Sequence, residues 1–140
     1  MKKQRGQSAV EFALMSPVVL LLIFGAIYGG IMFIQFMNYS NEARRIARDI
    51  AVTAAPQRGA LVAKYNGMNN FEGRTLGGIY KVELTTQLIK DGEPADSNEA
   101  EEVHVRFDFY HGETKEQLND FPFGFPPSSF AASYHMVLEN

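Results

Sequence analysis

The chain has 140 residues, no cysteine and a formal net charge of −3. The absence of cysteine excludes disulfides, thiol catalysis and Cys-based zinc sites. The charge is unevenly spread: residues 1–50 carry six Lys or Arg against three Asp or Glu, whereas the remainder carries seven against 13. An acidic C-terminal part argues against nucleic acid as a partner.

A long apolar stretch follows a short basic start. No charged side chain lies between Glu11 and Glu42, and as a helix this stretch would rise roughly 45 Å, more than the bilayer core of about 30 Å. We predict a single membrane span over about residues 12–37. The basic cluster before it, Lys2, Lys3 and Arg5, predicts a cytoplasmic N-terminus with the rest of the chain outside. Because small residues precede the apolar run instead of ending it, the helix should stay with the mature protein.

The helix is expected to continue beyond the membrane. Apolar residues recur at helical spacing on one face after residue 41, namely Ala43, Ile46, Ala47 and Ile50. One helix over residues 7–55, ended by Pro56, is the simplest interpretation. Its upper part, apolar on one side only, should pack against a small domain.

Residues 56–140 should form that domain, the head. Apolar and polar residues alternate near 79–89, 102–110 and 129–138, the period of half-buried strands. The middle run is the clearest, with Val103, Val105, Phe107 and Phe109 on one face. The sequence therefore predicts an α+β fold, shaped like a lollipop, in which a long N-terminal transmembrane helix extends into a small antiparallel sheet.

Several polar and aromatic groups in the head are candidate sites. Six carboxylates between Asp91 and Glu102 match no EF-hand spacing and favour a solvated, disordered loop over a calcium site. The histidines are expected at the surface, and would bind metal only if strands brought them together; they are His104, His111 and His135. The stiff segment 121–127 either exposes a contact patch or plugs the core with its phenylalanines, which are Phe121, Phe123 and Phe125.

No residue pattern in the chain indicates catalysis. No Ser/His/Asp order, phosphate-binding loop or paired acid and base emerges. We therefore expect no catalytic residues, no cofactor and no metal, and a protein that is not an enzyme.

The N-terminal residues resemble a known family. Gly6 is followed by a short spacer, by Ala9-Val10-Glu11-Phe12, and by an apolar run with an early proline, Pro17. This order resembles the class III signal of type IV pilin-like proteins and looks most like the TadE-like pseudopilins of tight-adherence pili. The resemblance extends through residues 41–48, returns weakly at 132–139 and does not cover the middle.

The resemblance implies a role in pilus assembly. It implies that residues 1–6 are a cytoplasmic leader, removed by a prepilin peptidase between Gly6 and Gln7. It further implies that Glu11 pairs with the amino terminus of a neighbouring subunit, with Phe12 and Pro17 in the same assembly segment. The implied function is a minor pilin or pseudopilin of the bacterial inner membrane and pilus. The implied partners are membrane lipid, fellow pilins, and a platform protein with its assembly ATPase.

Two other classes stay open on the sequence alone. The chain could be an uncleaved, single-pass membrane anchor whose head is a binding or scaffold module. It could also be an enzyme-like membrane protein whose site is completed by an unseen partner. An intact N-terminus would favour the first, and a pocket lined by titratable groups would favour the second.

Overall fold

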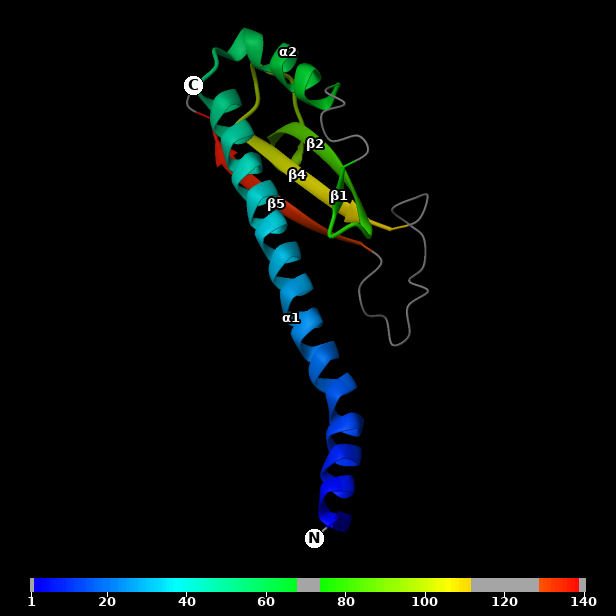
Figure 1. Cartoon of the computed structure of the whole chain (residues 1–140). Coiled ribbons are helices and arrows are strands. Elements are labelled where there is room, and N and C mark those ends of the chain that lie inside the picture. The colour runs from blue at the N-terminus through cyan, green and yellow to red at the C-terminus, as the bar shows by residue number, and fades with distance from the viewer. Residues whose placement is uncertain (1, 68–73, 112–128, 139–140) are drawn as a thin grey trace. The chain divides into compact units, whose positions relative to one another are not determined.

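The fold combines one long helix with a small antiparallel sheet (Figure 1). In a computed structural model, the structure is described over residues 2–67, 74–111 and 129–138, with side chains described for all of these except residues 2–6 and 129. Two compact units, Met1–Ile34 and Gln35–Asn140, divide the chain and are described separately. A long apolar N-terminal helix followed by a small antiparallel sheet confirms the predicted α+β class.

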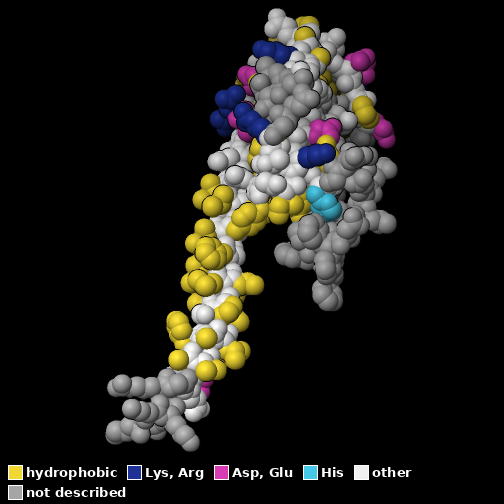
Figure 2. All heavy atoms as spheres, turned by 45° about the vertical axis from the view of Figure 1, so that its right-hand side comes forward, with side chains coloured by type: hydrophobic (Ala, Val, Ile, Leu, Met, Phe, Trp, Pro, Cys, Tyr) yellow, Lys and Arg dark blue, Asp and Glu magenta, His cyan; other side chains and the backbone are white. Residues whose placement is uncertain are grey.

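The first unit is the apolar part of α1 (Lys2–Ala51). Its large apolar side chains are exposed all round, from Val10 to Ile34, and Figure 2 shows hydrophobic side chains gathered along this segment. Among the described residues, α1 is the one helix long and apolar enough to cross a membrane by length and composition. A helix with no polar face has no preferred side toward water, which is the property of a segment that lies among lipids or other helices.

The C-terminal part of α1 belongs to the second unit and supplies part of its core. The predicted face is confirmed, because its four apolar residues are at most 1% exposed; they are Ala43, Ile46, Ala47 and Ile50. Within the two turns before Ala43, the Phe36 ring lies 5.7 Å from that of Phe109, and the Tyr39 ring lies 5.4 Å from those of Phe107 and Phe109. Aromatic pairs at these distances pack favourably beyond the area that they bury.

The end of α1 differs from the prediction. The helix ends at Ala51, not Ala55, and Pro56 lies in the first turn of α2 (Ala55–Asn66), where a missing N–H costs nothing. Arg58, which is only 2% exposed, donates hydrogen bonds to carbonyls at the end of α1. Its Nε donates to the Thr53 carbonyl at 2.9 Å and its Nη2 to the Ala51 carbonyl at 3.5 Å. A cation at a helix C-terminus also complements the helix dipole.

A second bond joins α2 to α1. The Tyr65 hydroxyl donates to Asp49 Oδ2 at 2.5 Å. Burial, followed by this hydrogen bond and the charge of Asp49, raises the pKa of Tyr65 to about 12. Because the raised pKa favours the neutral phenol, the contact is fully present below pH 10 and is lost only as the pH rises toward 12.

The sheet is an antiparallel set of consecutive neighbours. Its main strands are β2 (Tyr80–Lys90), β4 (Glu102–Tyr110) and β5 (Ser129–Val137), with two-residue strands β1 (Thr75–Leu76) and β3 (Glu93–Pro94) paired to β2. The order is β1-β2-β4-β5. The predicted inward face of the middle strand is confirmed, since its four apolar residues are 0% exposed; they are Val103, Val105, Phe107 and Phe109.

The acidic segment after β2 is ordered, so its interpretation as a disordered loop was wrong. Asp91 and Gly92 both have positive φ, 53° and 85°, and join β2 to β3 as a hairpin. Asp-Gly is the residue pair that such a two-residue turn favours. Farther along, Ala100 is fully buried and its N–H donates to the Asp96 carbonyl at 2.9 Å.

The edge of β2 between β1 and β3 is paired by a side chain. The Asn66 amide donates to the Thr86 carbonyl and accepts from the Thr86 N–H, both at 2.8 Å. One carboxamide thereby makes the two hydrogen bonds that a neighbouring strand would make. It satisfies backbone groups of a residue that is only 1% exposed.

The buried face of β4 gives the first prediction. Phe107→Ala should lower the free energy of unfolding by about 3–5 kcal/mol, as expected for truncating a core aromatic residue. Ser133→Ala, at the exposed position of β5 opposite Arg106, should change it by no more than about 0.5 kcal/mol. Chemical denaturation of the full chain in detergent, followed by near-UV circular dichroism, measures both. Equal effects would contradict the assigned register.

The Asn66 side chain gives the second prediction. Asn66→Ala should cost about 1–3 kcal/mol, because it leaves a buried N–H and carbonyl of Thr86 without partners. Gln57→Ala, an exposed position of the same helix, is the matched control and should be nearly neutral. The same denaturation experiment applies, and a neutral Asn66→Ala would show that water replaces the amide at this edge.

Candidate functional site

The predicted assembly segment lies at the N-terminal end of α1. The backbone around Gly6 and Gln7 is helical, since α1 begins at Lys2. Glu11 is exposed, and the Gln7 side-chain amide donates to its Oε1 at 3.4 Å. Phe12 is 75% exposed. A long hydrogen bond from a neutral amide compensates little of a carboxylate's charge, so Glu11 is available to a stronger partner.

Pro17 lies inside α1, which continues through it. Proline has no N–H, so the carbonyl of Ala13, four residues earlier, loses its helical partner. The Ser16 hydroxyl donates to that carbonyl at 3.4 Å. In a bilayer, serine side chains are among the groups that satisfy carbonyls freed by proline. The Ser16-Pro17 pair therefore allows a proline in an apolar helix without leaving a bare carbonyl.

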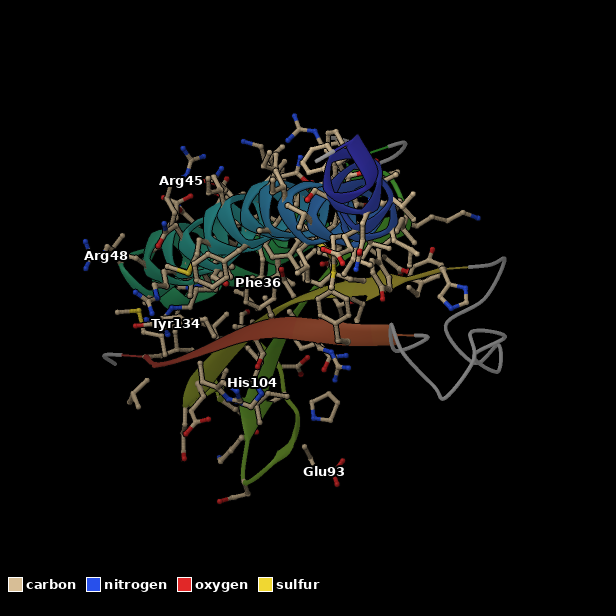
Figure 3. All side chains as sticks on the ribbon, turned by 60° about the horizontal axis from the view of Figure 1, so that its bottom comes forward. Phe36, Arg45, Arg48, Glu93, His104 and Tyr134 are labelled. Atoms are coloured by element: carbon tan, nitrogen blue, oxygen red, sulfur yellow. The ribbon has the colours of Figure 1, made fainter. Side chains whose placement is uncertain are left out.

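Three arginines mark the part of α1 in the second unit. Arg44, Arg45 and Arg48 are all exposed. Arg45 pairs with Glu42 at 3.4 Å, and the Arg44 guanidinium lies 5.6 Å from the centre of the Tyr134 ring. Figure 3 shows Arg45 and Arg48 pointing outward from this part of the helix. Exposed ion pairs of this kind contribute little stability. The three arginines therefore form a basic surface and add little to the stability of the fold.

The sheet face opposite the core carries a second group of polar side chains. His104 and His135 are directly opposite each other on β4 and β5. His104 Nε2 lies 2.9 Å from Glu102 Oε2 and 3.1 Å from His135 Nδ1. The two rings lie 4.0 Å apart at 60°. In the described part of the chain, this is the one group of three or more His or acidic residues with ligand atoms within 4.8 Å of one another.

The remaining predicted site residues are not brought together. Phe121, Phe123 and Phe125 lie outside the described residues, so the choice between a contact patch and a core plug stays open. His111 lies 6.2 Å from the Tyr80 ring, apart from the other two histidines. Three surface depressions among the described residues are lined by arginines of α1 or by the β2–β3 hairpin and the residues after it. None of these assembles a nucleophile with a base.

Sequence reasoning missed three of these arrangements. The pairing of His104 with His135 requires the register of β4 against β5, which alternation alone does not fix. The capping of α1 by Arg58 could not be predicted without knowing how the chain turns between α1 and α2. The hydrogen bond of the Ser16 hydroxyl could have been predicted, because a serine immediately before a proline in an apolar helix is a recognisable signal.

Comparison with known proteins supports the N-terminal interpretation. A family model described as TadE-like protein matches residues 6–48. No curated protein and no solved structure matches the chain. The match covers the predicted assembly segment, the apolar stretch of α1 and all three arginines of the basic surface. The family suspected from the sequence is thereby confirmed, and residues 6–48 of this chain are a TadE-like segment.

Proposed function

We propose that this protein is a minor pilin or pseudopilin of a tight-adherence, type IV-like pilus, processed after Gly6 and assembled through α1. One observation carries the proposal: the apolar unit of α1, with exposed apolar side chains on every side, has its lone carboxylate, Glu11, at its entry, inside the TadE-like segment. The proposed role is structural, and the part of the chain after the membrane span is carried outside the cytoplasm.

The apolar unit requires a covering. Exposed apolar surface of this extent is unfavourable in water, so it must lie among lipids or against other helices. Glycines on the helix would favour the second arrangement, since a Cβ at Gly25, Gly29 or Gly30 would meet no atom within 4 Å other than those of its chain neighbours and the adjacent helix backbone. Small residues let helix backbones approach closely in membranes. The same surface can thus serve as a membrane anchor first and as a filament contact later.

Glu11 supplies selectivity in this scheme. A carboxylate taken into an apolar bundle must find a positive partner, because an unpaired buried charge is strongly destabilising. Cleavage after Gly6 would create a new ammonium group at Gln7, four residues from Glu11. The ammonium of a neighbouring subunit is a far stronger partner than the Gln7 amide at 3.4 Å within the chain. Pairing between neighbours would then fix their register.

The proposed partners follow from these steps. A prepilin peptidase would cut the leader on the cytoplasmic side, where Lys2, Lys3 and Arg5 hold it. Fellow pilins would pack against α1, with Phe12 and Pro17 in the contact. A membrane platform protein and its cytoplasmic ATPase would drive assembly from the inner membrane. An uncleaved chain would instead point to the single-pass anchor with a binding or scaffold head.

The leader gives the third prediction. Protein purified from its native host should begin at Gln7, and Gly6→Leu should abolish this processing because a bulky side chain crowds the peptidase site. Gly6→Ala is the matched control and should still be cleaved. Intact-mass analysis distinguishes the two forms. A chain that begins at Met1 while pili assemble normally would refute the proposed processing.

Glu11 gives the fourth prediction. Glu11→Ala should insert with its N-terminus inside and be cleaved, but should fail to enter filaments, since losing one partner of a buried pair costs about 3–5 kcal/mol. The control is Glu42→Ala on the same helix, which loses only an exposed pair with Arg45 and should assemble normally. Topology reporters, the mass assay and in vivo cross-linking between subunits test both variants. Normal incorporation of Glu11→Ala would reduce Glu11 to an interfacial carboxylate.

A further inference from the structure

We propose that Glu102, His104 and His135 form a binding site for a divalent transition metal, Zn²⁺ in the first instance, on the outer face of the sheet. Two strands build it. On β4, Glu102 and His104 are two residues apart and point to the same face, while the register pairs His104 with His135 of β5. Facing residues of an antiparallel pair have Cβ atoms about 4.5–5.5 Å apart, close enough for two imidazoles to share one ion.

The distances between ligand atoms fit a tetrahedral ion. Zn²⁺ binds imidazole nitrogen and carboxylate oxygen at about 2.0–2.2 Å, so two ligands on a tetrahedral centre lie about 3.3–3.6 Å apart. His104 Nε2 is already 2.9 Å from Glu102 Oε2 and 3.1 Å from His135 Nδ1. All three ligand atoms lie within 4.8 Å of one another. Side-chain shifts of a few tenths of an ångström at the shorter distances would admit the ion without moving the strands.

Hydrogen bonds alone do not satisfy all three polar atoms of this cluster. The Nε2 atom of a neutral imidazole carries either one proton or one lone pair. If His104 Nε2 carries the proton, it must divide that proton between the Glu102 carboxylate and His135 Nδ1. If it carries the lone pair, that lone pair faces the carboxylate oxygen. A divalent cation accepts lone pairs from all three atoms at once and removes the conflict.

The surroundings leave the site open to an ion. Figure 3 shows His104 on the side of the sheet away from α1, whereas Phe36 lies between α1 and the sheet. His135 is exposed and Glu102 and His104 are half-buried. The next residue of β4 on this face, Arg106, is directed to Asp108 by a 2.7 Å ion pair. Three protein ligands leave a fourth tetrahedral position for water or for a group from another molecule.

The ligand set selects the class of metal. Two imidazoles and one carboxylate suit Zn²⁺, Ni²⁺ or Cu²⁺, whereas Ca²⁺ and Mg²⁺ prefer six or more oxygen ligands. Cysteine is absent from the chain, so the affinity must come from imidazole and carboxylate alone. This site is independent of the proposed assembly role, which rests on residues of α1.

Titration of the full chain in detergent, purified without a histidine tag, tests the site. Zn²⁺ should bind saturably at one equivalent in competition with a chromophoric chelator, and Co²⁺ should give the visible absorption of tetrahedral coordination. His104→Ala, His135→Ala and Glu102→Gln should each weaken Zn²⁺ binding by at least about tenfold, a loss that even outer-shell partners can cause. Excess Zn²⁺ should raise the melting temperature of the wild-type chain but not that of the His104→Ala/His135→Ala double variant.

Two controls make the result decisive. His111→Gln removes a histidine outside the cluster and should leave Zn²⁺ binding unchanged, and Ca²⁺ should not compete with Zn²⁺. The metal-free melting temperatures should match across the variants; if that of the double variant falls, the exposed single change His135→Gln decides instead. Unchanged Zn²⁺ affinity in the folded histidine variants, or no saturable binding by the wild-type chain, would overturn the proposal.

Discussion

The burial of one stripe of α1 by the sheet is the contact on which the second unit depends. Four residues of the helix are at most 1% exposed, and rings of Phe36 and Tyr39 continue the contact onto Phe107 and Phe109 of β4. Without cysteine, no disulfide can hold this small core. The helix is therefore as much a part of the domain as the strands.

The same helix meets two different environments. Its first unit is apolar on all sides, and its second part has an apolar stripe opposite exposed arginines. Charge is correspondingly absent from the apolar stretch and returns at Glu42. At the far end of the stretch, Glu11 accepts a long hydrogen bond from the Gln7 amide. The distribution of charge thus marks where the wholly apolar part of α1 ends and the part that packs against the sheet begins.

Prediction from the sequence worked where periodicity is strong. Strict alternation identified the buried face of β4, and helical spacing identified the buried stripe of α1. Pro56 was misplaced because a proline fits the first turn of a helix as well as it ends one. Order in the 91–102 segment was missed because its charge outweighed the Asp-Gly turn signal. The pairing of His104 with His135 could not be predicted, since it depends on strand register, a property of two segments separated by 31 positions.

Sheet order has a kinetic consequence for a chain synthesised from its N-terminus. The α1 stripe is made first, yet the strands that cover it follow one by one, and β5 comes last in the order β1-β2-β4-β5. Until β5 has left the ribosome, part of the apolar surface that α1 and the sheet bury together stays uncovered. Such intermediates are prone to aggregation and benefit from chaperones. The short connections between neighbouring strands up to β4 let those strands pair early, because local antiparallel pairs close faster than distant ones, so that β5 alone remains to be added.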